Sequence, residues 1–153
     1  MYPDNIMVLA ESFLYNNSVL ESSRKDTMLL SGTVNYKDLI ANIKTIDNPH
    51  DDKSKAVKIV FYNKTNNKIG EVCISSADTN SGFVYNLEVV KKYRGHGYGR
   101  KIMNFVLDNY KIKDLTVDPD NQVAINLYKS LGFKVKQLWN DPTTGKDVYW
   151  MIY

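Results

Sequence analysis

The spacing of apolar residues along this chain changes from a helical period to a strand-like one. In the N-terminal third, apolar residues recur every three or four positions in two stretches, as on the buried side of an amphipathic helix. The first stretch starts after Pro3 and contains Ile6, Leu9, Ala10, Phe13 and Leu14. The second is YKDLIANIKTI, with Leu39, Ile40 and Ile43 on one side. Two helices are therefore predicted, separated by a long polar connection within residues 16–34.

After residue 55 the pattern is that of β-strands. AVKIVFY and KIGEVCIS are rich in β-branched and aromatic residues, and the turn-forming NKTNN joins them, which predicts a β-hairpin. GFVYNLEVV predicts a third strand. A helix is predicted from Tyr98, with Ile102, Phe105, Val106 and Tyr110 facing inward. A short buried strand DLTV, a helix over NQVAINLYKSLG, and a hairpin of FKVKQLW with KDVYWMIY follow.

This order of elements indicates a mixed α/β fold, expected to form a single domain over residues 1–153. The unit from Phe83 to Val117 predicts a right-handed crossover between two parallel strands. Gly132 is expected to end its helix in a left-handed conformation, with Phe133 packing back against it.

The composition excludes several classes of protein. No apolar run reaches 18 residues, and the N-terminus lacks the features of a signal peptide, so neither a membrane span nor a leader is predicted. Cys73 is the only cysteine, which fits a reducing cytoplasm and suits a small core residue. One cysteine and two separated histidines predict no metal site. The net charge of +3 suits an anionic ligand but does not indicate a nucleic-acid partner.

Three alternating glycines, Gly95, Gly97 and Gly99, lie between the third strand and the following helix. A helix N-terminus exposes unpaired amides, and glycines let the backbone approach a phosphate closely. Arg94 and Arg100 flank the glycines, with Lys91, Lys92 and Lys101 nearby. This stretch therefore predicts a site for a di- or polyphosphate, although its spacing is neither that of a P-loop nor that of a dinucleotide fingerprint. A glycine-rich turn beside a solvated basic patch is the alternative interpretation.

Two signatures in the second half resemble the GNAT superfamily of N-acetyltransferases. RGHGYG fits R/Q-x-x-G-x-G/A and follows a strand of the form L-x-V-x-x-x-Y-R. NQVAINLYKSLGFK fits N-x-x-A-x-x-L-Y-x-x-x-G-F. The resemblance extends from about Phe61 to Tyr153 and implies a mostly antiparallel sheet with a central parallel strand pair, flanked by helices. The N-terminal third carries no matching signature, and the usual first strand is missing or shortened to MYP.

The resemblance also implies acetyl-CoA as cosubstrate. The pyrophosphate would lie on the loop, with Arg94, Gly95, His96, Gly97, Tyr98, Gly99 and Arg100 as the cofactor-binding residues. The pantetheine arm would pair with the backbone near Leu87 and Val89 and would contact Asn121. Asn121 also stands where a helix N-cap is expected, and it could serve both roles. The side chain of His96 is expected to be exposed.

Acetyl transfer to an amine needs a base, an oxyanion donor and an acid. A main-chain N–H near Val89 would bind the oxyanion, and Tyr128 would protonate the departing thiolate, unless it is simply a core residue on its helical stripe. Some relatives carry a glutamate in L-E-V before the asparagine motif, where this chain has Leu115, Thr116 and Val117. Glu88, Asp118 or a water chain remain as candidates for the base.

The predicted function is therefore an acetyl-CoA-dependent N-acetyltransferase that acts on a primary amine by direct attack. The alternative is a non-catalytic GNAT-fold module that binds coenzyme A or another phosphate ligand and regulates a partner. The acceptor, a small molecule or a protein amine, is left open. The acidic DNPHDD stretch would suit a polyamine but reads more simply as a solvated loop. A monomer or a homodimer is expected, with VYWMIY as a strand able to pair with a second subunit.

Overall fold

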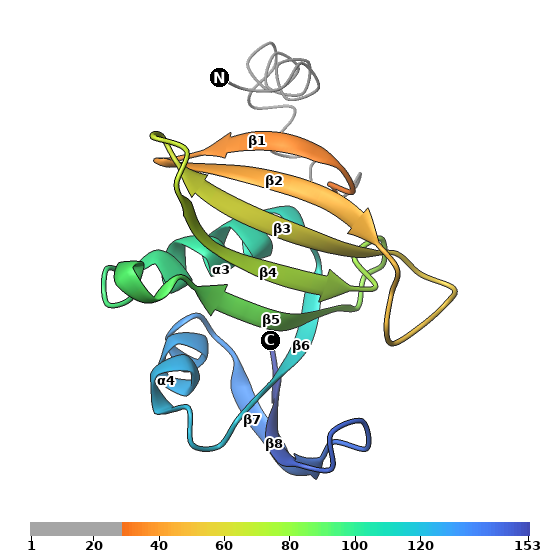
Figure 1. The fold of residues 1–153 in the computed structure, drawn as a ribbon. Coiled ribbons are helices and arrows are strands. Elements are labelled where there is room, and N and C mark those ends of the chain that lie inside the picture. The colour runs from red at the N-terminus through yellow and green to blue at the C-terminus, as the bar shows by residue number, and fades with distance from the viewer. Residues whose placement is uncertain (1–28) are drawn as a thin grey trace.

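The computed structural model describes residues 29–153. The helix predicted after Pro3, most of the 16–34 connection and the question of a first strand at MYP all lie outside the described residues. The described part forms one eight-stranded sheet in the order β1-β2-β3-β4-β5-β6-β8-β7 (Figure 1). Its elements are β1 (Gly32–Tyr36), β2 (Leu39–Ile46), β3 (Ala56–Asn63), β4 (Lys68–Ser75), β5 (Gly82–Val89), the 3-10 turn η1 (Lys91–Tyr93), α3 (Tyr98–Asn109), β6 (Ile112–Val117), α4 (Gln122–Ser130), β7 (Lys134–Asn140) and β8 (Asp147–Ile152).

The prediction of a helix over residues 36–46 is wrong, because this stretch contains strand β2. The apolar residues that decide the structure alternate: Leu39, Ala41 and Ile43 are all buried on one face, which is the period of a strand. A two-residue turn with Lys37 at φ +57° pairs β2 with β1, and β3 covers its other edge along its full length. Only three apolar residues supported the helical spacing, and strand pairing on both sides outweighs it.

The predictions after residue 55 are confirmed at the level of elements. β3 and β4 form the expected hairpin, β7 and β8 form another, and α3 and α4 begin at or next to the predicted residues. β5 and β6 are parallel, and every other strand pair in the described sheet is antiparallel. β8 lies between β6 and β7, so both of its edges are used and VYWMIY is not a free edge.

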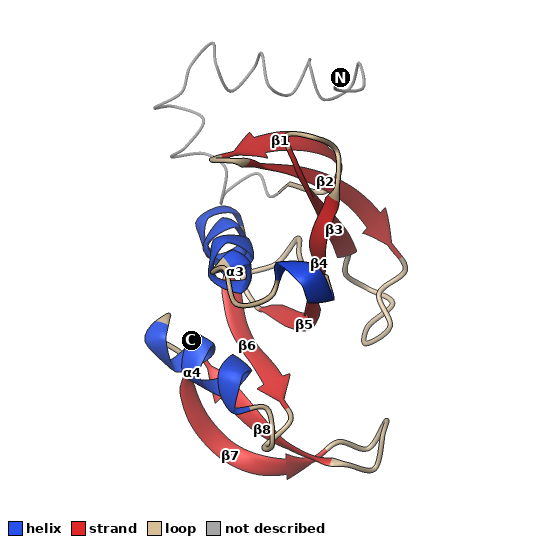
Figure 2. Ribbon diagram, turned by 60° about the vertical axis from the view of Figure 1, so that its left-hand side comes forward, coloured by secondary structure: helices blue, strands red, loops and turns tan. Residues whose placement is uncertain are grey.

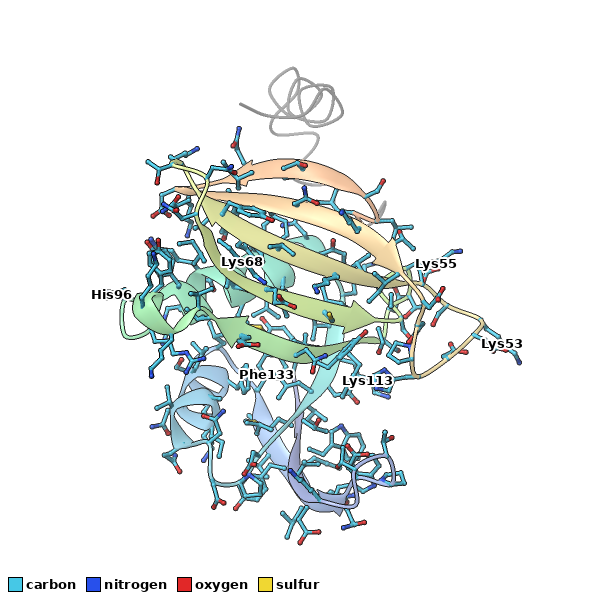
Figure 3. All side chains as sticks on the ribbon, in the orientation of Figure 1. Lys53, Lys55, Lys68, His96, Lys113 and Phe133 are labelled. Atoms are coloured by element: carbon cyan, nitrogen blue, oxygen red, sulfur yellow. The ribbon has the colours of Figure 1, made fainter. Side chains whose placement is uncertain are left out.

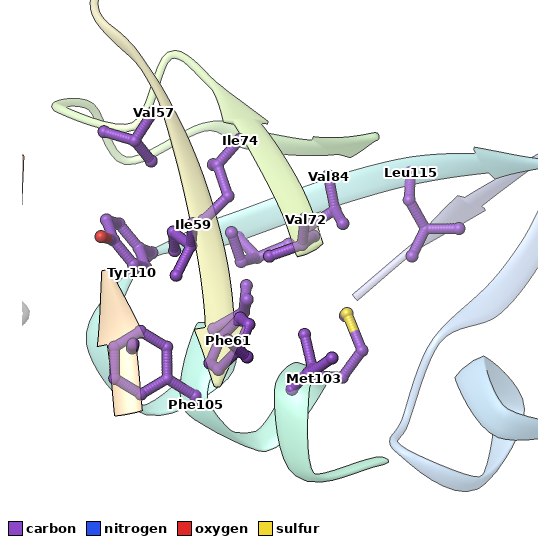
Figure 4. Close-up of a cluster of buried hydrophobic side chains, with 14 of the residues drawn as sticks. Val57, Ile59, Phe61, Val72, Ile74, Val84, Met103, Phe105, Tyr110 and Leu115 are labelled. Atoms are coloured by element: carbon purple, nitrogen blue, oxygen red, sulfur yellow. The ribbon is translucent and has the colours of Figure 1, made fainter. Parts of the chain in front are cut away.

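Both described helices lie on the same face of the sheet (Figure 2). α3 buries Ile102, Met103, Phe105 and Val106 in the apolar core. The close-up shows Met103 and Phe105 beside apolar residues of β3, β4 and β5 (Figure 4). Tyr110 is buried as predicted, and its hydroxyl donates to the carbonyl of Leu29. This packing fixes the position of the α3 N-terminus relative to the end of β5.

The end of α4 is held by a Schellman motif. Gly132 has φ +107°, its amide donates to the Lys129 carbonyl at 3.1 Å, and the Phe133 amide donates to the Tyr128 carbonyl at 3.0 Å. The Phe133 ring then packs against the Tyr128 ring with a centroid separation of 5.9 Å. The predicted helix end is confirmed, and it fixes the side chain of Tyr128.

Candidate active site

β5 and β6 separate after only three paired positions. They pair at Gly82 with Ile112, Phe83 with Asp114, and Val84 with Leu115. Beyond Val84, β5 continues alongside β4, whereas β6 continues alongside β8. The strands therefore splay apart at the centre of the sheet (Figure 1), and the edge of β5 over residues 85–89 faces an opening instead of a strand.

A β-bulge in β5 sets the direction of the groups at this edge. Asn86 and Leu87 together oppose Val72, and Asn86 has φ +53°. Glu88, opposite Glu71, consequently lies on the same face as Tyr85, the face away from α3 and α4. Val90 donates its N–H to Ile69 at 2.8 Å. Since opposed residues of an antiparallel pair alternate in exchanging hydrogen bonds, the neighbouring Val89 directs its N–H and C=O away from β4, towards the opening.

The opening is part of a cavity of about 860 Å³. Its lining comes from both faces of the sheet: Ala124, Leu127 and Tyr128 belong to α4, whereas Tyr85, Glu88 and Thr116 lie on the opposite face. Of the coenzyme-binding and catalytic residues predicted from the sequence, the structure brings together all except His96 and Asp118. Those that line the cavity are Leu87, Glu88, Val89, Arg94, Gly95, Gly97, Tyr98, Gly99, Arg100, Asn121 and Tyr128.

The three alternating glycines serve two different purposes. Gly95 and Gly97 have φ +79° and +81°, and a Cβ on either would meet no atom within 4 Å. They let the chain turn into α3, of which Gly97 is the N-cap. Gly99 has an ordinary helical conformation, but a Cβ there would lie 3.3 Å from Leu127 Cδ2. The third glycine therefore permits α3 and α4 to approach each other closely.

The N-terminus of α3 is suited to an anion. Its first turn contains no acidic residue, and its first amides have no helical carbonyl to bond to. Arg100 donates from Nη2 to Ser130 Oγ at 2.9 Å, which holds the guanidinium beside the end of α4. Lys101 instead forms an ion pair with Asp38 at 2.9 Å and lowers the pKa of that carboxyl. His96 is exposed at the outer edge of the loop (Figure 3).

α4 contributes one residue at its start and one at its end. Asn121 Oδ1 accepts from the Ala124 amide at 3.1 Å, so the predicted N-cap is present, and the residue also lines the cavity. Tyr128 is 6% exposed, and burial raises its pKa to about 12. Within residues 29–153 no group is hydrogen bonded to the Tyr128 hydroxyl, and this oxygen is not fully covered. The phenol is therefore a protonated donor that has no acceptor among the described residues.

The two carboxylates proposed as a base differ in position. Glu88 lies at the cavity with its side chain 71% exposed, 3.9 Å from Arg94 Nη2. Asp118 is outside the cavity lining and accepts from the Asp120 amide at 2.8 Å in the turn before α4. Asp118 therefore shapes this turn, and Glu88 is the candidate that the structure leaves at the site.

Sequence reasoning missed Tyr85 and Thr116 as lining residues. Both belong to strands whose side chains alternate between faces, and only the splay of β5 from β6 exposes them to the cavity. Burial raises the pKa of Tyr85 to about 12, with the opposing Cys73 thiol as a lesser cause. Cys73 is itself buried in β4, as expected for a core residue. In the described part of the chain, no three His, Cys, Asp or Glu side chains gather as metal ligands would.

The chain belongs to the Acetyltransferase (GNAT) family, which matches residues 27–133. It is also similar to N-alpha-acetyltransferase 30 of Schizosaccharomyces pombe, with 32% identity over 74 residues, 44% of this chain and 49% of that protein. The chain thus spans about half the length of this relative. No helix in residues 29–153 is both long and apolar enough to span a membrane.

Solved structures share the fold. Spermidine N-acetyltransferase from Vibrio cholerae, in complex with CoA and spermine, has a TM-score of 0.56 and 22% identity, over 64% of each chain. The IAA acetyltransferase from Bacillus cereus has a TM-score of 0.57 and 14% identity, over 73% of this chain and 97% of that one. The ribosomal-protein-S18-alanine N-acetyltransferase from Escherichia coli has a TM-score of 0.52 and 19% identity, over 63% and 66%.

Proposed function

We propose that this protein is an N-acetyltransferase that moves the acetyl group of acetyl-CoA to a primary amine by direct attack. The observation that carries the proposal is the single cavity that joins the unpaired edge of β5, the glycine loop before α3, and Tyr128 on α4. An acetyl thioester attached to a diphosphate would use all three features at one place: the loop for the diphosphate, the strand edge for the arm, and Tyr128 for the sulfur. Acetyl-CoA supplies the activated acetyl group, and the chain supplies the groups around it.

The binding roles follow from which backbone groups are free. The start of α3 would take the pyrophosphate, with the Arg100 guanidinium held nearby by Ser130. The pantetheine arm contains amides, and the edge of β5 at Leu87 and Val89 offers the strand-like partner that they need. Asn121 lies on the opposite wall of the cavity, and its side chain already caps α4.

The chemical roles follow from charge. An aliphatic ammonium, with a pKa of about 10.4, must lose a proton before its nitrogen attacks the acetyl carbon. The oxygen of the tetrahedral intermediate becomes negative, and the Val89 N–H is directed towards the opening where it would stabilise that charge. When the C–S bond breaks, Tyr128 gives its proton to the sulfur. Burial disfavours a thiolate just as it disfavours a phenolate, which reduces the cost of this transfer.

Glu88 is the proposed route for the proton of the amine. It lies on the face away from α4, so base and acid would act from opposite faces of the sheet. Because Thr116 occupies the position where some relatives carry a glutamate, a water molecule between the amine and Glu88 would complete the path. The acceptor is an amine of unspecified size, since the similar proteins are named for spermidine and for a protein alanine.

Calorimetric titration with acetyl-CoA, with ATP and NAD as control ligands, is the first test. Saturable binding of acetyl-CoA alone, followed by release of free thiol with spermidine or with an alanine-terminated peptide, is the expected result. Binding without thiol release from any amine would favour the regulatory module over the enzyme. If a folded sample bound no acetyl-CoA, the proposal would be wrong.

A further inference from the structure

Arg94 opens the glycine signature, yet its side chain folds back towards the strand that precedes the loop. Arg94 Nε donates to the carbonyl oxygen of Val89 at 2.8 Å. The same guanidinium lies 3.9 Å, through Nη2, from the Glu88 carboxylate. Both contacts are with β5, whereas Arg100 interacts with the end of α4. Arg94 therefore belongs to the glycine loop in sequence, but its side chain contacts the end of β5.

The Val89 carbonyl lies on the part of the β5 edge where the ligand arm would pair. Val89 directs both its N–H and its C=O towards the opening, because the neighbouring pair Val90–Ile69 carries the hydrogen bond to β4. A ligand arm that adds to this edge as a strand would meet two groups at Val89 that β4 does not bind. Arg94 occupies one of them, the carbonyl, and leaves the N–H free.

The two contacts of Arg94 differ in strength. The pair with Glu88 is long, and both side chains are more than half exposed, so water screens most of its attraction. The bond to the carbonyl is short and has a charged donor, which makes it the stronger interaction. The main effect of Arg94 is therefore on the peptide group at the end of β5.

We propose that Arg94 is a positioning residue that terminates the free edge of β5 and thereby fixes how far along this edge the coenzyme's amide arm pairs. The position of the arm sets the depth of the acetyl carbonyl relative to the Val89 N–H. In this role Arg94 is not a ligand of the pyrophosphate. The inference rests on the proposed acetyltransferase function and adds a determinant of its donor geometry.

Two donors separate positioning from phosphate binding. S-acetylpantetheine carries the thioester and the amide arm of acetyl-CoA but none of its phosphates. The measurement is kcat/KM for acetyl-CoA and for S-acetylpantetheine, with the same amine acceptor, in wild type and in Arg94→Met, which has no side-chain donor. The expected result is a loss of about tenfold with both donors, the size of one charge-assisted hydrogen bond expressed in the transition state. A loss confined to acetyl-CoA would overturn the inference.

Two further variants test the assignment. Arg94→Lys keeps the charge but lacks the planar Nε donor, so it is expected to lose as much as Arg94→Met; restoration of activity by lysine would mean that charge alone matters. Arg100→Gln is the contrast, expected to raise the KM for acetyl-CoA. Circular dichroism verifies folding, and if Arg94→Met does not fold, Arg94→Lys carries the comparison. Absence of transfer by wild type from both donors would instead contradict the proposed function.

Discussion

Tyr128 combines the burial of a core residue with a place in the lining of the cavity. Its ring is packed against Phe133 and the apolar core, and the residue lines the cavity between α4 and β5. The sequence could place Tyr128 on the inner side of a helix, but it could not show that this side meets an opening in the sheet. The raised pKa follows from the burial alone.

Replacement of Tyr128 by phenylalanine is expected to lower kcat about 100-fold, the lower range for loss of a general acid. The affinity for acetyl-CoA should remain unchanged, because the ring stays in place. Steady-state kinetics and calorimetry measure the two quantities.

Tyr110→Phe is the matched control for this experiment. Tyr110 is also a buried tyrosine, but its hydroxyl bonds to Leu29 and lies outside the cavity lining. This variant should lose about 1 kcal/mol of stability and retain its turnover. Equal turnover in Tyr128→Phe and wild type would remove Tyr128 from the mechanism.

Among the elements, β2 shows what the sequence could not decide. Leu39, Ile40 and Ile43 fit a helix, and Leu39, Ala41 and Ile43 fit a strand equally well over so short a stretch. Pairing with β1 and β3 makes this stretch a strand, and this pairing cannot be predicted from the local spacing of apolar residues. The hairpins and α3 were predictable because turn residues and periodicity agree there.

The Schellman end of α4 gives a prediction for this element. Gly132→Ala places a Cβ at φ +107°, which costs about 1 to 2 kcal/mol for an L-residue. We expect a lower midpoint of urea unfolding and also a lower kcat, because the Phe133–Tyr128 contact follows this turn. Gly132→Asn should be milder, since asparagine tolerates left-handed conformations better. If Gly132→Ala kept full stability and activity, the turn would tolerate a Cβ at this position without loss of free energy of unfolding.

At the scale of the whole molecule, buried tyrosines make stability depend on alkaline pH. Burial raises the pKa of Tyr85 and Tyr128 from about 10 to about 12, and it raises that of Tyr110 further. A raised pKa means that the folded state holds the proton more tightly, so this stabilisation is complete below pH 10. It is lost as the pH rises from about 10 towards 12.

Urea unfolding between pH 8 and pH 11.5 checks this dependence. The free energy of unfolding should be flat at first and should fall above pH 10. Tyr110→Phe, which removes the most deeply buried of these phenols, should reduce the slope. A slope that is the same in this variant would show that other groups cause the loss.

The topology of the sheet was partly predictable. The parallel unit from Phe83 to Val117 followed from the order of elements, and the two signatures indicated the family. Neither the point after Val84 at which the strands splay nor the bulge at Asn86 follows from the periodicity of the sequence, because both depend on which neighbour each strand follows. These two features decide which residues face the cavity.

The cavity is lined from both faces of the sheet, and this has a consequence for the order of binding. A donor that enters beside α4 does not block an amine that arrives on the face of Glu88, so both substrates can be present before any product leaves. Initial rates at several fixed amine concentrations should therefore give double-reciprocal lines that intersect. Parallel lines would mean that coenzyme A departs first and that the acetyl group waits on the protein.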